Sequence, residues 1–288
     1  MSEPAIVAKG LAYNYGDLMA VDHIDFEVGK GEILGFLGPN GAGKTTTVKM
    51  LTGQLRPKAG KAEVLGLSVQ DNVREIQGRI GICFEETNLY ESMSARENLN
   101  LFARLFGVDG FDPDRLLDRV GLSGRGKEKV RNYSKGLKQR LMVARSILHR
   151  PDILFLDEPT DGLDPSSAES IRDVILEERD RGASVFLTTH NMAEADKLSD
   201  RVAFLDQGKI VALDKPHNLK QKYGSRTLLA EVVTEGGELE EIEITLDRGE
   251  TPEQVKQLFA DHKVSTVHTR EATLEDIFID ITGRGLTE

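Results

Sequence analysis

The chain lacks several features that would place it in particular protein classes. Its 288 residues contain no tryptophan and one cysteine, Cys83, so no disulfide can form within the chain. No apolar run reaches the roughly eighteen residues of a membrane-spanning helix. The first residues, Met1-Ser2-Glu3-Pro4, lack the basic and apolar regions of a secretory signal. We therefore expect a cytoplasmic protein in which Cys83 is a small core residue.

Positive charge is also scarce. The formal net charge is −11, from 48 acidic and 37 basic side chains. A general nucleic-acid binder needs a basic face, so this balance argues against nucleic acid as a partner. Residues 225–288 hold 15 acidic and 6 basic side chains, a net charge of −9. This shift in composition predicts a small, acidic C-terminal domain at 225–288, after a main domain at 1–222.

A glycine-rich motif follows the apolar segment 32–37, which is typical of a short buried strand. It fits the pattern G-x-x-x-x-G-K-[ST], whose glycines adopt backbone angles closed to other residues and turn N–H groups toward a polyphosphate. Lys44 then reaches the β- and γ-phosphates, and Thr45 offers its hydroxyl to Mg²⁺. A helix over 46–53 directs its positive end at the same phosphates. The predicted phosphate-binding residues are Gly38, Pro39, Asn40, Gly41, Ala42, Gly43, Lys44, Thr45 and Thr46.

Two later strands end in side chains with useful chemistry. The apolar run 153–156 is followed by Asp157 and Glu158. Asp157 is placed to hold Mg²⁺, and Glu158 to orient or deprotonate an attacking water. Two acids at a strand end are often a solvated turn, but the phosphate-binding motif upstream favours the functional interpretation. His190 follows the next strand, 183–187, where it can hydrogen-bond a γ-phosphate.

Strands and helices alternate along the first 222 residues, which predicts an α/β fold with a parallel sheet and crossover helices. From about residue 88 to 140, apolar residues recur at three- and four-residue spacing, which predicts a helical subdomain inserted into that sheet. The C-terminal part is predicted to run β, β, α, β, α, a small α+β appendage.

The stretch Tyr-Ser-Lys-Gly-Leu-Lys-Gln-Arg at 133–140 narrows the class further. With the motifs above, it resembles the ATP-binding subunits of ABC transporters, whose signature is Leu-Ser-Gly-Gly-Gln. Ser134 and Gly136 match that signature, and three of its five positions differ. The resemblance covers residues 5 to about 220 and implies a P-loop ATPase with an ABC-type mixed sheet. Without the family, Ser134 is a helix cap, and the two interpretations are compatible.

The resemblance assigns further residues. It implies that Tyr15 stacks on adenine, and that Asp164, in the segment Gly-Leu-Asp, belongs to a loop through which two subunits communicate. Ser134 and Gly136 would contact the γ-phosphate held by the second subunit. Glu85 stands where the family usually has a glutamine that senses Mg²⁺. This is a departure, because a carboxylate can ligate Mg²⁺ but adds negative charge beside the phosphates.

The resemblance also implies partners. Two ATP molecules with Mg²⁺ are buried between two such domains, and this chain has one, so a second ATPase subunit is needed; a homodimer is the simplest solution. A separate transmembrane permease would dock between Glu85 and Phe106 and hold the protein on the inner face of the cell membrane. Candidate contacts there are Leu89, Tyr90, Met93 and Leu101, whose alternative role is core packing.

The signature variant and the segment 273–284 resemble bacterial exporters of antibiotics, peptides, lipids or polysaccharides. Alternatives are an importer subunit, a soluble ABC ATPase acting on ribosomes or DNA, and a regulatory module with little hydrolysis. The single domain, the lack of a long coiled coil and the acidic charge disfavour the ribosome and DNA class. The intact Lys44, Asp157, Glu158 and His190 disfavour the regulatory module.

Overall fold

The structure is a computed structural model that describes residues 3–224, 227–234, 237–246 and 250–285. Contacts divide the chain into two compact units, with the division after Leu213. The sequence suggested a boundary between 222 and 225 instead, and the functional extent of each domain stays a prediction. Each unit is described by itself below.

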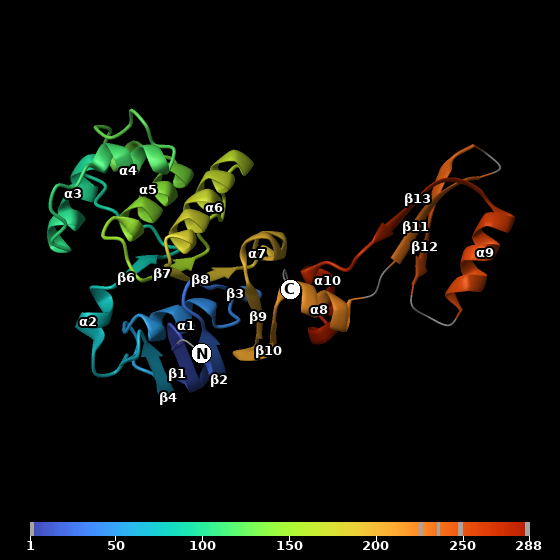
Figure 1. The fold of residues 1–288 in the computed structure, drawn as a ribbon, viewed down its shortest axis with the longest axis horizontal. Helices are drawn as coiled ribbons and strands as arrows, with labels where there is room; N and C mark the ends of the chain where they lie inside the picture. Colours follow the sequence, from blue (N-terminus) through green and yellow to red (C-terminus); the bar gives the residue numbers. More distant parts are fainter. Residues whose placement is uncertain (1–2, 225–226, 235–236, 247–249, 286–288) are drawn as a thin grey trace. The chain divides into compact units, whose positions relative to one another are not determined.

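A six-stranded sheet forms the centre of the first unit (Figure 1), in the order β10-β9-β3-β8-β7-β6. β3 pairs in parallel with β8 and β9, and β7 pairs in parallel with β8 and β6. The predicted parallel sheet is confirmed, although β9 and β10 were not anticipated. The strands are β3 (Ile33–Leu37), β6 (Ile80–Cys83), β7 (Ile153–Asp157), β8 (Ser184–Thr189), β9 (Arg201–Asp206) and β10 (Lys209–Asp214).

Both faces of this sheet are covered, which explains why its central strands are continuously apolar. Along β7, Leu154 and Leu156 pack into one core with the helices α3, α4, α5 and α6. Phe155 points the other way, into a core with α1 and a second sheet. Figure 1 shows α5 and α6 on one side of the strands and α1 on the other. The helices are α1 (Lys44–Leu51), α3 (Ala95–Leu105), α4 (Pro113–Arg119), α5 (Lys135–Ile147) and α6 (Pro165–Asp180).

The second sheet has four strands in the order β2-β1-β4-β5, and β1 runs antiparallel to both β2 and β4. The expected strand at 5–8 is the start of a ten-residue strand that ends at Tyr15. The predicted turn at Gly16-Asp17 joins it to β2, so Tyr15 lies at the tip of a hairpin. Bounds are β1 (Ile6–Tyr15), β2 (Leu18–Val28), β4 (Ala59–Val64) and β5 (Leu67–Ser68). Parallel and antiparallel strands together confirm the mixed α/β fold.

The inserted helical subdomain is confirmed, and its ends are defined by capping. Ser94 and Glu97 form a reciprocal capping box at the start of α3. Ser134 accepts a hydrogen bond from the backbone of Leu137 and begins α5. α5 continues to Ile147, beyond the expected limit near 140, because its later turns are buried against β6. Three short helices complete the unit: α2 (Val73–Gln77), the 3₁₀ helix at Val130–Asn132 and α7 (Met192–Leu198).

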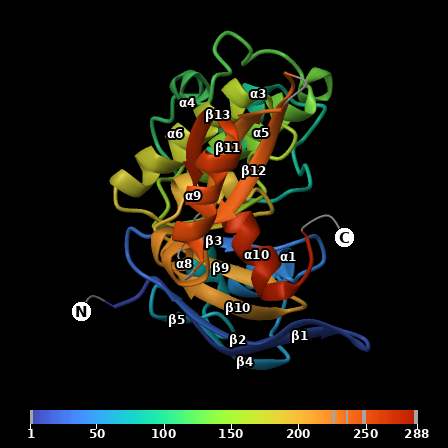
Figure 2. The same ribbon diagram turned by 90° about the vertical axis from the view of Figure 1, so that its right-hand side faces the viewer.

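The second unit has the predicted order β, β, α, β, α after a preceding helix. Its sheet runs β12-β11-β13, antiparallel throughout, with α9 packed on it (Figure 2). A small core of Leu228, Ala230, Val232, Ile244 and Leu258 holds it together. The elements are α8 (Pro216–Tyr223), β11 (Thr227–Val233), β12 (Leu239–Thr245), α9 (Thr251–Asp261), β13 (Lys263–Arg270) and α10 (Leu274–Thr282).

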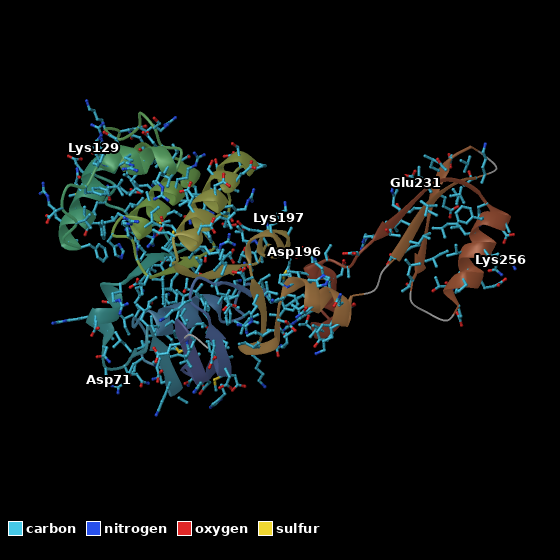
Figure 3. The ribbon with its side chains drawn as sticks, viewed as in Figure 1. Asp71, Lys129, Asp196, Lys197, Glu231 and Lys256 are labelled. Atoms are coloured by element: carbon cyan, nitrogen blue, oxygen red, sulfur yellow. The ribbon has the colours of Figure 1, made fainter. Side chains whose placement is uncertain are left out.

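Many of the ion pairs lie on the surface. Lys129 and Lys256, labelled in Figure 3, pair with Glu97 at 3.2 Å and Glu253 at 3.7 Å. Because solvent reaches these pairs, they contribute little to stability. In the part of the chain that the structure describes, no helix combines the length and apolar character needed to span a bilayer.

Candidate active site

Three neighbouring strands bring the predicted site together. β3, β8 and β7 lie side by side and parallel, so their carboxyl ends meet at one edge of the sheet. The glycine-rich loop follows β3, His190 follows β8, and Asp157 and Glu158 stand at the end of β7. Ligands in α/β proteins bind outside this edge.

The glycine-rich loop is shaped by two different requirements. Gly41 and Gly43 have φ of 81° and 109°, values that side chains disfavour. Gly38 has no positive φ; a Cβ there would lie 2.2 Å from the carbonyl oxygen of Leu205. The expectation that all three glycines serve unusual backbone angles was therefore wrong for Gly38, which is needed for space. The helix begins at Lys44, two residues earlier than predicted.

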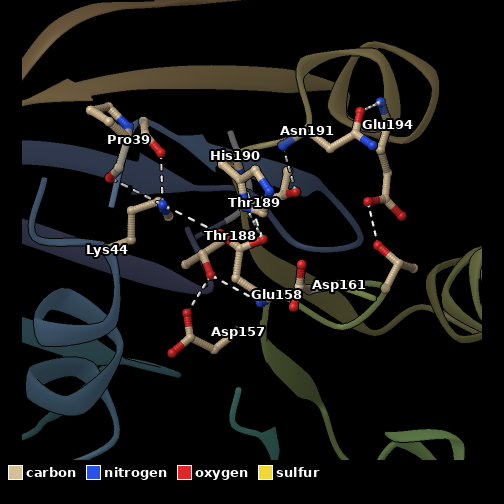
Figure 4. Close-up of polar contacts among 12 residues, drawn as sticks. Pro39, Lys44, Asp157, Glu158, Asp161, Thr188, Thr189, His190, Asn191 and Glu194 are labelled. Carbon is tan, nitrogen blue, oxygen red and sulfur yellow. Dashed lines mark hydrogen bonds and ion pairs between the residues drawn. The ribbon is translucent and has the colours of Figure 1, made fainter. Parts of the chain in front are cut away.

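The ammonium of Lys44 is held by several acceptors (Figure 4). Its Nζ donates to the carbonyl of Gly38 at 2.7 Å and of Pro39 at 3.2 Å. It also lies 3.3 Å from Oε1 of Glu158, and both side chains are less than a tenth exposed. The Lys44 ammonium is therefore bound to a carboxylate at the position where the sequence predicts a phosphate contact.

Glu158 also contacts His190. Its Oε2 accepts from the backbone N–H of His190 at 3.3 Å and lies 3.0 Å from the ring Nδ1. The backbone φ of Glu158 is 50°, which is unusual for a residue with a side chain. Gln139 lies on α5, the helix that follows Ser134. Its side-chain Nε2 is 3.5 Å from the backbone carbonyl oxygen of Glu158. Backbone strain held by surrounding contacts is characteristic of functional residues.

Asp157 is almost fully buried, at 1% exposed. Burial raises the pKa of its carboxyl, while hydrogen bonds from Thr188 and Thr45 lower it and the charge of Glu158 raises it. Its Oδ2 has no hydrogen-bond partner among the described residues. A free carboxylate oxygen beside the Thr45 hydroxyl is a donor set that suits Mg²⁺.

A pocket of about 320 Å³ gathers most of the predicted residues. Tyr15, 47% exposed, lines it together with Glu85 from another part of the chain. The lining residues are Tyr15, Leu18, Ala20, Pro39, Asn40, Gly41, Gly43, Lys44, Thr45, Thr46, Glu85 and Glu158. The structure thus joins Tyr15, the phosphate loop, Glu85 and Glu158 in one hollow, whereas Asp157 and His190 do not line it.

The signature residues do not line that pocket. Gly136 lies against the loop after β7, since a Cβ there would meet the Leu163 side chain at 3.1 Å. In the same region Lys135 pairs with Asp161 at 2.7 Å. Asp164 accepts from the backbone N–H of Ser167 at 3.0 Å and caps α6, and hydrogen bonds from Ser167 lower the pKa of Asp164. Ser134, Gly136 and Asp164 therefore lie apart from the pocket of their own chain.

Sequence reasoning missed the side chains that hold the acids in place. The Thr188 hydroxyl, on the neighbouring strand β8, donates to Asp157. The Thr160 hydroxyl, in the loop after β7, donates to Glu194 at the start of α7. A signal existed only for Thr188, which precedes Thr189 and His190 at the end of a strand expected to lie near Asp157.

Comparisons with known proteins agree with this geometry. A family model described as ABC transporter matches residues 21–161. A fluoroquinolones export ATP-binding protein of Mycobacterium tuberculosis is 44% identical over 98% of this chain and 94% of its own length. The chain belongs to the ABC transporter family. As an ABC ATPase, it binds and hydrolyses ATP.

Other ABC proteins are similar as well. A daunorubicin resistance ATP-binding protein of Streptomyces coeruleorubidus is 39% identical over 83% of this chain and 77% of its own. A solved structure of an ATP-binding subunit of an ABC transporter matches with a TM-score of 0.71 at 28% identity, over 76% of this chain and 93% of that one. The predicted P-loop ABC fold is confirmed.

Proposed function

We propose that this ABC ATPase dimerises around two Mg²⁺-ATP and powers export through a separate membrane protein. Support for export comes from relatives named for the export of fluoroquinolones and for daunorubicin resistance. Support for the residues comes from one observation: Lys44 and His190 converge on the two carboxylate oxygens of Glu158.

That convergence suggests how the residues work. Phosphate oxygens displace Glu158 from Lys44, and His190 turns its ring toward the γ-phosphate. Glu158 is then free to take the proton of the attacking water, a general-base contribution of roughly 10²–10⁴ in rate. Lys44 meanwhile compensates the charge that develops on the phosphate.

Asp157 and Thr45 would hold Mg²⁺, and Glu85 would be a third oxygen donor at the pocket wall. No group of three His, Cys, Asp or Glu side chains suited to a metal occurs among the described residues. This composition suits Mg²⁺, which takes few protein ligands and completes its shell with phosphates and water. The ion neutralises phosphate charge when bound.

A second subunit follows from the residues outside the pocket. Ser134 and Gly136 stand at the N-terminus of α5, which favours anions, yet they line no pocket with Lys44. In a twofold homodimer they would meet the γ-phosphate of the opposite chain, with Asp164 beside the interface.

A docking place for the membrane protein is proposed at a second hollow of about 330 Å³, between α3 and the strand β6. Tyr90 is 50% exposed and Phe106 37% exposed at this groove. Arg145 lies 4.7 Å over the ring of Phe102, and His149 stacks on Phe106 at 3.9 Å. Exposed aromatic side chains around a buried Arg are typical of protein interfaces. Of the four candidates from sequence, Tyr90 lines this groove and Leu89 is buried in the helical core.

The test is purification of tagged Glu158→Gln protein from a native membrane extract with Mg²⁺-ATP, followed by mass spectrometry. We expect a multi-span membrane protein to co-purify, and to be absent with Lys44→Ala. This outcome would also place the chain peripherally on the membrane. Ribosomal or DNA-repair proteins without a membrane partner would refute the transport role and leave the ATPase intact.

A further inference from the structure

Two loops at the edge of the central sheet carry the proposed catalytic side chains. One follows β7 and runs from Glu158 to Asp164; the other follows β8, carries His190 and leads into α7. They are joined at two points (Figure 4). The first is the contact between Glu158 and His190, and the second is a hydrogen bond from the Thr160 hydroxyl to Oε2 of Glu194 at 2.5 Å.

The second contact is geometrically well defined. Asn191 caps α7 by accepting from the backbone N–H of Glu194 at 3.0 Å, which fixes Glu194 in the first turn. The Glu194 side chain then reaches across to the β7 loop and is 3% exposed. On the other side, Thr160 is held by the turn in which its carbonyl accepts from Leu163 at 3.1 Å.

Stability alone does not explain a carboxylate here. The Oε1 of Glu194 is buried without a hydrogen-bond partner among the described residues. The pKa of Glu194 is raised, chiefly by burial and also by the negative charge of Glu158. The hydrogen bond from Thr160 and the charges of Arg172 and His190 act in the opposite direction. A buried acid with one unpaired oxygen costs stability compared with a well-packed apolar side chain. Such costs are commonly borne at functional sites.

The two contacts differ in what catalysis does to them. The Glu158–His190 contact uses groups that the reaction needs elsewhere, since His190 turns to phosphate and Glu158 to water. The Thr160–Glu194 contact uses neither group, so neither of these movements requires it to open.

We propose that Glu194 is a positioning residue for ATP hydrolysis: by accepting from Thr160, it keeps the loop that carries Glu158 aligned with the loop that carries His190. Glu194 does not line the pocket that contains Lys44 and Glu158. It acts on the placement of Glu158, where an error of about 1 Å costs on the order of a hundredfold in rate. This inference rests on the proposed roles of Glu158 and His190.

The decisive variant is Thr160→Val, because it removes only the hydroxyl donor and leaves the acidic charge at the start of α7. We expect kcat to fall about tenfold or more, with ATP affinity changed less than about twofold. Thr160→Ser keeps the hydroxyl and should restore kcat. Glu194→Gln keeps an acceptor oxygen and should retain most activity, whereas Glu194→Ala should match Thr160→Val.

A double variant and a matched control complete the test. Thr160→Val and Glu194→Ala each remove the same hydrogen bond. The double variant should therefore have the same kcat as either single variant. Glu178 is the control: it is also 3% exposed and makes ion pairs with Arg119 and Arg181, remote from the site. Glu178→Gln should lower the melting temperature but leave kcat per folded molecule unchanged.

Several outcomes would overturn the proposal: wild-type kcat in Thr160→Val, multiplicative losses in the double variant, or an equal loss of kcat in Glu178→Gln. Glu158→Gln, measured in parallel, separates this failure from failure of the proposed function. If that variant still hydrolyses ATP, the catalytic assignment itself is wrong.

Discussion

The contact between Lys44 and Glu158 predicts that Glu158→Gln binds nucleotide more tightly than the wild type. The two charged atoms are 3.3 Å apart and both side chains are less than a tenth exposed. At an effective dielectric of 20, their gross attraction is about 5 kcal/mol. Most of this offsets desolvation, and a hydrogen bond to a charged group has a net value of about 1.5–3 kcal/mol. Glutamine weakens the competition for Lys44, so the dissociation constant should fall about tenfold.

ADP is the informative ligand for this measurement. It reaches Lys44 through its β-phosphate, but it has no γ-phosphate to be repelled by Glu158 and is not expected to close the dimer. Calorimetric titration with ADP therefore isolates the competition between Glu158 and phosphate for Lys44. Titration with ATP adds the repulsion between Glu158 and the γ-phosphate and the closure of the dimer. Turnover should fall at least about a hundredfold in the same variant, because the general base is lost.

Two controls frame the result. Lys44→Ala should bind both nucleotides at least about tenfold more weakly, since it removes a charge-assisted phosphate contact. Glu178→Gln, which neutralises a buried acid remote from the site, should bind ADP like the wild type. Unchanged ADP affinity in Glu158→Gln would refute the idea that Glu158 and phosphate compete for Lys44.

Three further outcomes are expected. Burial raises the pKa of Cys83 to about 12, so its thiol should not react with Ellman's reagent at pH 8 until the protein is unfolded; stoichiometric labelling of folded protein would contradict this. Burial also raises the pKa of Glu194 in the folded protein above its usual 4.5. The folded state therefore loses stability as the pH rises from about 4.5 through this raised pKa. Glu194→Gln should then melt above the wild type at pH 8, with the difference shrinking toward pH 4.5. Replacing Tyr90 and Phe106 together by Ala should leave the basal ATPase rate unchanged and reduce recovery of the membrane protein about tenfold, whereas Leu105→Ala, which removes an exposed apolar side chain that does not line the groove, should not.

Much of the site could be predicted because chemistry and pattern coincide in the sequence. The apolar runs before Gly38, Asp157 and His190 mark buried parallel strands, and parallel strands bring their carboxyl ends to one edge. The strands β9 and β10 were missed because no motif lies beside them and their ends are charged. The φ of Glu158 could not be predicted either, since tertiary contacts impose it against the preference of the residue.

Side-chain pairing was the least predictable level, because it depends on how loops lie across neighbouring strands. Lys44 and Glu158 were assigned separate tasks from sequence, one on phosphate and one on water. Their contact supports the proposal that the tasks are linked, because the proposed base is bound by the proposed phosphate ligand. In this proposal, a phosphate that binds Lys44 gains a counter-ion and at the same time releases Glu158 to act as the base. The same logic explains why a second, independent contact between the loops is valuable, because alignment of Glu158 cannot depend on bonds that the substrate itself breaks.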